Sequence, residues 1–226
     1  MSVQPVLDLS MQPSHYQSLA AIRSALFAFF AGGFGYPNAS QFERFASGVF
    51  WTEMRELIDL LGIRSEVCTK PSPTRAQSVI DLRVCYTALF DVCGSRPRVS
   101  LLERRYVDKI ESEQSLWEDL LRFYRHFGLD FASGRTEENP DHLLLQLEFM
   151  HYMTFLEAGA PPKQRKSLQR AQHDFLDSHL GRWVNTLHEQ LAKQATPGPY
   201  ATLAKSLAEF VVHDHTYLDS QISERS

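Results

Sequence analysis

Apolar side chains recur along this chain at steps of three and four residues, the spacing that places them on one face of a helix. Glycine or proline stands where most of these runs stop, as Gly32-Gly33 does after the first. No segment alternates between apolar and polar residues for long enough to predict a strand. The pattern predicts helices over 14–31, 38–61, 79–90, 113–127, 143–156, 163–195 and 200–218.

Two of these segments indicate how the helices are arranged. Residues 143–156 carry apolar side chains on nearly every side, which indicates a buried central helix, because the segment is too short to cross a membrane. Residues 163–195 predict one long amphipathic helix. We therefore predict an all-α fold, a single-domain bundle of about seven helices. It has an N-terminal lead over 1–13, the helical domain over 14–219 and a flexible tail over 220–226.

The composition fits a globular protein and excludes several other classes. The 226 residues are 43% hydrophobic, which is too apolar for a disordered chain. Lys and Arg number 23 against 27 Asp and Glu, a net charge of −4. This balance argues against a nucleic-acid-binding protein, which needs an excess of cations to neutralise phosphates. No apolar run reaches the roughly 18 residues that a membrane span requires.

Two features predict a cytoplasmic protein. The three cysteines, Cys68, Cys85 and Cys93, form no CxxC pair and no zinc-ligand spacing, which favours reduced thiols. The apolar run near the N-terminus has no Lys or Arg before Arg23, so the basic region of an export signal is missing.

The sequence contains no common catalytic motif and one pattern that partly matches a metal site. No GxxxxGK[ST] phosphate loop, GxGxxG turn or GxSxG nucleophile elbow is present. Glu148 and His151 match the Glu-x-x-His spacing of di-iron bundles, but those sites need the motif on two helices and two more glutamates. His213 and His215 point to different faces of a helix, because they are two residues apart. We predict no metal, no cofactor and no enzymatic activity. The alternatives are a helical metalloprotein that uses Glu148 and His151, and a plain protein-interaction adaptor.

The loop before the helix at 143–156 holds a cluster of ionisable residues. Glu137, Glu138, Asp141 and His142 surround the start of this helix. Acidic side chains there stabilise the helix dipole and cap free N–H groups. The same residues, beside an apolar helix face, also suit a peptide in which basic residues precede an apolar run. The sequence leaves both interpretations open.

Four segments carry motifs in a fixed order. They are Y-x-x-L-F at 86–90, an acidic-aromatic segment at 103–108, E-x-x-D-H at 138–142 and F-x-x-x-H-L-x-x-W at 175–183. Together these motifs resemble those of the TorD/DmsD/NarJ family of molybdoenzyme-specific chaperones, also called redox enzyme maturation proteins. The resemblance extends from about residue 20 to about residue 215. One departure is Arg104, at a position where the family often has a serine.

The resemblance implies a TorD-like, cytoplasmic chaperone, either a monomer or a domain-swapped dimer. Such a protein binds the signal peptide or the body of an unfinished catalytic subunit and assists insertion of the molybdenum cofactor before export. The client is a molybdoenzyme of the dimethyl sulfoxide reductase type, of the nitrate reductase, ethylbenzene dehydrogenase or dimethyl sulfide dehydrogenase kind. The residues implied in client binding are Glu138, Pro140, Asp141, His142, Glu103, Tyr106, Tyr86, Phe90, His179 and Trp183.

Overall fold

A computed structural model describes residues 19–63, 76–91, 97–107, 113–129 and 139–223. Across these ranges the chain is helical, and the extended backbone pairing is a single bridge between Leu102 and His142. The all-α prediction is confirmed. The elements are α1 (Leu19–Phe34), α2 (Ala39–Ser47), α3 (Val49–Leu60), α4 (Val79–Phe90), the 3₁₀ turn η3 (Glu103–Arg105), α5 (Glu113–His126), α6 (Leu143–Gly159), α7 (Pro162–Phe175), the π-helical turn η4 (Leu176–Leu180), α8 (Gly181–Ala192) and α9 (Tyr200–Ser223).

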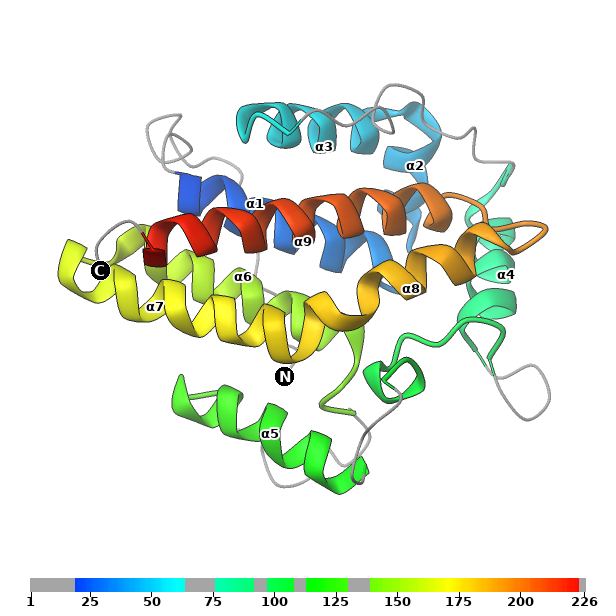
Figure 1. Cartoon of the computed structure of the whole chain (residues 1–226). Helices are drawn as coiled ribbons and strands as arrows, with labels where there is room; N and C mark the ends of the chain where they lie inside the picture. Colours follow the sequence, from blue (N-terminus) through cyan, green and yellow to red (C-terminus); the bar gives the residue numbers. More distant parts are fainter. Residues whose placement is uncertain (1–18, 64–75, 92–96, 108–112, 130–138, 224–226) are drawn as a thin grey trace.

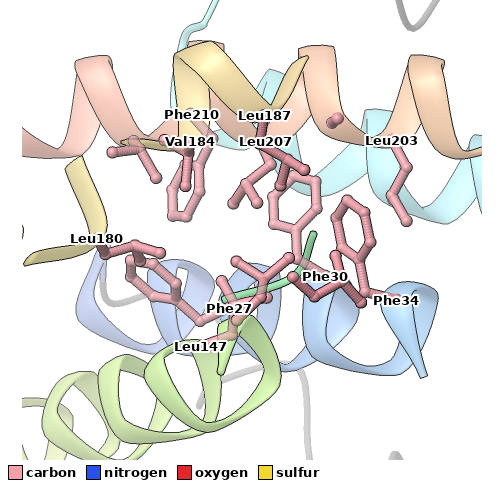
Figure 2. Close-up of a cluster of buried hydrophobic side chains, with 14 of the residues drawn as sticks. Phe27, Phe30, Phe34, Leu147, Leu180, Val184, Leu187, Leu203, Leu207 and Phe210 are labelled. Carbon is pink, nitrogen blue, oxygen red and sulfur yellow. The ribbon is translucent and has the colours of Figure 1, made fainter. Parts of the chain in front are cut away.

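The centre of the molecule is a set of packed helices from both halves of the chain. The first helix, α1, lies along α6, and α9 lies along α7 and α8. In Figure 1, α3 and α5 lie on opposite sides of this central group. The core between α1, α6, α8 and α9 consists of large apolar side chains that are almost fully buried (Figure 2): Phe27, Phe30, Phe34, Leu147, Leu180, Val184, Leu187, Leu203, Leu207 and Phe210. At about 25 cal/mol per Å² of apolar surface, burial of this kind is the main stabilising contribution.

The apolar helix predicted over 143–156 is the central helix α6. Its residues Leu147, Met150 and Met153 have no exposed surface. Glu148 and Phe155 are exposed, the latter with 55% of its surface, so one face of α6 reaches solvent.

The first predicted helix end is wrong, because α1 continues through Gly32 and Gly33 to Phe34. A Cβ atom added at Gly33 would lie 2.8 Å from the Cδ2 atom of Leu203. The glycine at this position therefore permits α1 and α9 to approach closely. The predicted start of this helix, over 14–18, lies outside the described residues.

Two predicted helices are divided. The helix expected over 38–61 breaks at Gly48, whose φ of 81° is a left-handed conformation that glycine adopts readily. The helix expected over 163–195 contains η4, a turn with π-helical hydrogen bonding that separates α7 from α8. At the C-terminus, α9 extends to Ser223, so the first residues of the predicted tail are helical.

Among the described residues, no single helix has both the length and the hydropathy of a membrane span. Within the described ranges, the pair α1 and α2 meets that criterion when the two are taken together, but they are bent by 109° relative to each other.

Candidate functional site

The acidic-aromatic segment and the E-x-x-D-H motif, far apart in the sequence, pair through their backbones. The Glu103 N–H donates to the Asp141 carbonyl at 3.0 Å, and the Leu143 N–H donates to the Leu101 carbonyl at 2.8 Å. These bonds hold η3 beside the start of α6. Two of the motifs therefore form one site.

Asp141 is the centre of the first part of this site. Its side chain is fully buried, and its carboxylate accepts hydrogen bonds from the Arg104 guanidinium at 2.9 Å and the Trp117 indole N–H at 3.1 Å. The backbone N–H of Arg104 also donates to this carboxylate, at 3.2 Å. Arg104 further forms an ion pair of 3.0 Å with Glu113. Asp141 therefore connects η3 and α5 to the start of α6.

Glu103 is the centre of the second part and is also fully buried. Its carboxylate accepts a hydrogen bond from the Gln146 amide at 2.5 Å and lies 3.3 Å from Nδ1 of His179. The Gln146 carbonyl accepts a hydrogen bond from the Trp183 indole at 3.1 Å. The Tyr106 ring stacks on Trp183, with centroids 5.1 Å apart. These contacts join η3 and α6 to η4 and α8.

Two tyrosine hydroxyls complete the network as neutral donors. The Tyr124 hydroxyl donates to the Pro140 carbonyl at 2.9 Å, and the Tyr106 hydroxyl donates to the Ser100 carbonyl at 2.6 Å. Burial raises the pKa of Tyr124 well above its ordinary value, and the nearby carboxylates of Glu103 and Asp141 raise it further. The phenol therefore stays protonated and keeps its hydrogen bond.

His142 supports the helix-capping interpretation of the loop. It is the N-cap of α6, and its Nδ1 accepts a hydrogen bond from the Leu144 N–H at 3.2 Å. Asp141 uses its carboxylate in the buried network instead. Glu137 and Glu138 lie outside the described residues.

The structure brings together most of the predicted site residues and leaves two elsewhere. Tyr86 and Phe90, on α4, pack with Phe34 and Tyr200 in a separate aromatic cluster. Burial, with the charge of Asp91, raises the pKa of Tyr86 to about 12. The network itself contains Glu103, Tyr106, Pro140, Asp141, His142, His179 and Trp183.

Arg104, Trp117 and Gln146 belong to the network, although sequence reasoning did not select them. Arg104 was visible only as a departure from the family pattern. Trp117 lies in an amphipathic helix and Gln146 lies between two leucines, so neither residue differs from an ordinary helix residue in the sequence. Their partners are distant in the sequence, so no local spacing indicates them.

The alternative of a metalloprotein that uses Glu148 and His151 receives no support from the geometry. Nδ1 of His151 lies 2.8 Å from the Ser24 hydroxyl and 3.0 Å from the Ser24 carbonyl, so this nitrogen contacts α1. Burial lowers the pKa of His151 below its ordinary value. Glu148 is exposed, and neither residue belongs to a converging group of potential metal ligands in the described part of the chain.

A second buried polar cluster surrounds Arg23 of α1. Its guanidinium pairs with Asp214 of α9 and with Glu157 of α6, the latter at 2.7 Å, and donates to the Gln172 amide oxygen at 2.6 Å. Burial alone would lower the pKa of Arg23, but the charges of Asp214 and Glu157 outweigh it and raise that pKa. The cluster connects α1, α6, α7 and α9.

A pocket lies beside this cluster, at the C-terminal end of α6. It has a volume of about 360 Å³, and its lining includes Glu157, Arg165, Lys166 and Tyr217. The 17 residues of α6 span about 25 Å at 1.5 Å per residue. The pocket is therefore separate from the Asp141 network.

The fold and the network define an all-helical protein in which three family motifs interlock around two buried carboxylates. Residues 49–189 match the family described as nitrate reductase delta subunit. The chain belongs to this family, and the resemblance to the TorD/DmsD/NarJ chaperones is confirmed.

Three relatives share much of this chain. The dimethyl sulfide dehydrogenase assembly chaperone protein of Rhodovulum sulfidophilum is 31% identical over 224 residues, which cover 94% of this chain and 85% of the relative. The perchlorate reductase assembly chaperone protein of Dechloromonas aromatica is 29% identical over 200 residues, covering 85% and 88%. The selenate reductase assembly chaperone protein of Thauera selenatis is 32% identical over 138 residues, covering 60% and 69%.

Proposed function

We propose that this protein is a non-enzymatic, cytoplasmic chaperone for one molybdenum enzyme of the dimethyl sulfoxide reductase type. It binds the catalytic subunit through its signal peptide, its body or both. It holds the subunit while the molybdenum cofactor is inserted and releases it for assembly and export. The observation that carries this proposal is the similarity, over most of the chain, to the assembly chaperones of dimethyl sulfide dehydrogenase and perchlorate reductase.

We propose further that the client contacts the partly exposed edge of the network, the α5–α6 rim. This rim consists of Leu102, Tyr106, Trp117 and His142, all of which are partly exposed. Its aromatic and apolar surface suits the hydrophobic part of a leader peptide. The exposed carboxylates Glu113 and Glu118 on α5 suit the basic residues that precede that part.

In this proposal the predicted site residues divide into two roles. His142 and Tyr106 have surface available for direct contact. Glu103, Asp141, His179 and Trp183 are buried, so they position the rim and do not touch the client in this conformation.

Co-purification and metal content test the function. The tagged protein is expressed in its native host, and proteins bound to it are identified by mass spectrometry. We expect the catalytic subunit of one molybdoenzyme, lacking its cofactor, and a loss of molybdenum from that enzyme when the chaperone gene is deleted. If no such subunit binds and the deletion strain loads molybdenum normally, the proposal is wrong. Binding without any effect on molybdenum content would identify an adaptor instead.

Point variants test the rim. His142→Asn retains a side chain suited to an N-cap but removes the imidazole, so we expect weaker client binding at an unchanged melting temperature. Glu56→Gln is the control, because Glu56 is exposed on α3, across the molecule from α5 (Figure 1). Equal client binding by His142→Asn and the native protein would contradict the rim assignment without affecting the chaperone function.

A further inference from the structure

Two histidines and an aspartate from separate helices meet on the surface of α7 and α9. They are His173 of α7 and His215 and Asp219 of α9. One ligand atom from each can be chosen so that all three lie within 4.8 Å of one another. The imidazole rings lie face to face at a tilt of 34°, with centroids 4.6 Å apart. In the described part of the chain, no other group of three histidine, cysteine, aspartate or glutamate side chains converges in this way.

The central member of this cluster is Asp219. One of its carboxylate oxygens lies 2.9 Å from Nε2 of His173, and the other lies 3.4 Å from Nδ1 of His215. The opposite nitrogen of each ring faces another carboxylate. Nδ1 of His173 lies 3.4 Å from Asp174, and Nε2 of His215 lies 3.8 Å from Asp177. Each imidazole therefore has one nitrogen toward the centre and the other toward an outer carboxylate.

The contact between His173 and Asp174 resembles the outer contact of a metal-binding histidine, and Asp177 lies just beyond hydrogen-bond distance of His215. A histidine ligand usually donates its second ring N–H to a carboxylate, which orients the ring and makes the coordinating nitrogen more basic. Around the two imidazole rings stand three carboxylates, and within the described ranges none of the three forms an ion pair with Lys or Arg. The local charge therefore favours a cation.

We propose that His173, His215 and Asp219 bind a divalent transition-metal cation of the zinc class, with Asp174 and Asp177 orienting the two histidines. Zinc bound by nitrogen and oxygen at about 2.0–2.2 Å places its ligand atoms about 3.3 Å apart in a tetrahedral site. Rotation of the three side chains supplies the contraction that this requires, because 22%, 32% and 55% of their respective side-chain surfaces are exposed. Two imidazoles and one carboxylate suit zinc better than magnesium or calcium, which prefer oxygen ligands.

The π-helical turn contributes to this site. Asp177 lies in η4, directly after α7, where the wider turn changes the direction of the side chains that follow His173. A bound cation would connect α7 to α9 across 46 positions of sequence. This site does not depend on the proposed client and lies on elements other than those of the α5–α6 rim.

Zinc titration of the untagged protein tests the proposal. The full chain is stripped with chelator, kept reduced with a phosphine, and titrated with Zn²⁺ by calorimetry, with elemental analysis after gel filtration. We expect one zinc per chain, no comparable binding of Mg²⁺, and a melting temperature that rises with zinc concentration. Absence of stoichiometric zinc would overturn the proposal.

Variants locate the binding. His173→Ala, His215→Ala and Asp219→Asn should each weaken zinc binding at least 100-fold, and Asp174→Asn should weaken it about 10- to 100-fold. His213→Ala is the matched control, because it removes an imidazole from α9 two positions away and should bind like the native protein. The metal-free melting temperature of each variant shows that it is folded. Native affinity in His173→Ala and His215→Ala would indicate other ligands, such as the thiols, and would overturn the assignment.

Discussion

Arg23 shows what a single buried charge does in this structure. It lies on α1 with 1% of its surface exposed, and the carboxylates of Glu157 and Asp214 neutralise it from two other helices. A buried ion pair contributes little net stability, because desolvation of the charges offsets their attraction. Removal of the arginine alone is costly, however, because the carboxylates of Glu157 and Asp214 then stay buried without a compensating positive charge.

We therefore predict that Arg23→Met lowers the free energy of unfolding by about 3–5 kcal/mol. Chemical denaturation followed by circular dichroism measures this value. Arg44→Met is the control, because Arg44 pairs with Glu53 while more than a third of each side chain is exposed, and such pairs contribute about 0–1 kcal/mol. A similar small loss for both variants would mean that the Arg23 cluster relaxes or admits water.

His151 makes stability depend on pH. Burial lowers its pKa in the folded protein below the ordinary value of about 6.5, so the unfolded chain binds the proton more readily. The stability that this residue contributes is present above pH 6.5 and decreases as the pH falls below that value. Asn retains a polar group near the position of Nδ1 but does not titrate.

We predict that His151→Asn reduces the loss of stability between pH 7 and pH 5, measured by urea denaturation at each pH. His126→Asn, at an exposed position on α5, should leave the pH dependence unchanged. An identical pH profile for His151→Asn and the native protein would show that His151 is not the responsible group.

At the scale of elements, η4 determines where the side chains after α7 point. Gly181 follows this turn, and a Cβ atom added there would lie 2.6 Å from the Leu176 carbonyl oxygen. The contact is with backbone, so it cannot be relieved by a side-chain rotation. The glycine therefore permits the chain to pass from the π turn into α8, which places both His179 and Trp183 in the buried network.

We predict that Gly181→Ala destabilises the protein by about 1–3 kcal/mol, the typical cost of an extra methyl group in a well-packed protein interior. Thermal unfolding measures the effect. Gly32→Ala is the matched helical control, since a Cβ atom there meets nothing within 4 Å, and it should be neutral or stabilising by up to about 1 kcal/mol. Equal stability of the two variants would mean that the π turn is not required.

At the scale of the whole molecule, the Asp141 network connects an outer helix to the central group. The helix α5 lies to one side of the bundle (Figure 1). Its Phe123 and Tyr124 rings pack against Phe149 of α6. At its N-terminal end, Trp117 donates to Asp141. These contacts determine the position of α5, and hence the shape of the α5–α6 rim.

We predict that Trp117→Phe, which deletes the indole donor but keeps an aromatic ring, costs about 1–3 kcal/mol and increases hydrogen exchange in residues 113–126 above all. Exchange measured by mass spectrometry resolves this segment. Gln114→Ala removes an exposed hydrogen bond to Glu118 on the same helix and should change little. A uniform increase in exchange over the whole chain would contradict a local role for Trp117.

The sequence by itself determined that these segments are helical, because apolar spacing is a local property of the chain. The bounds of α4 and α5 match the predicted 79–90 and 113–127 within one residue, and the family followed from the order of the motifs. Only the tertiary structure decided that Asp141 and Glu103 are buried and that Arg104, Trp117 and Gln146 are their partners. It also decided that η4 interrupts the long helix, and that His173 meets His215. These features depend on which distant segments pack together. The spacing of residues within one segment does not indicate that packing.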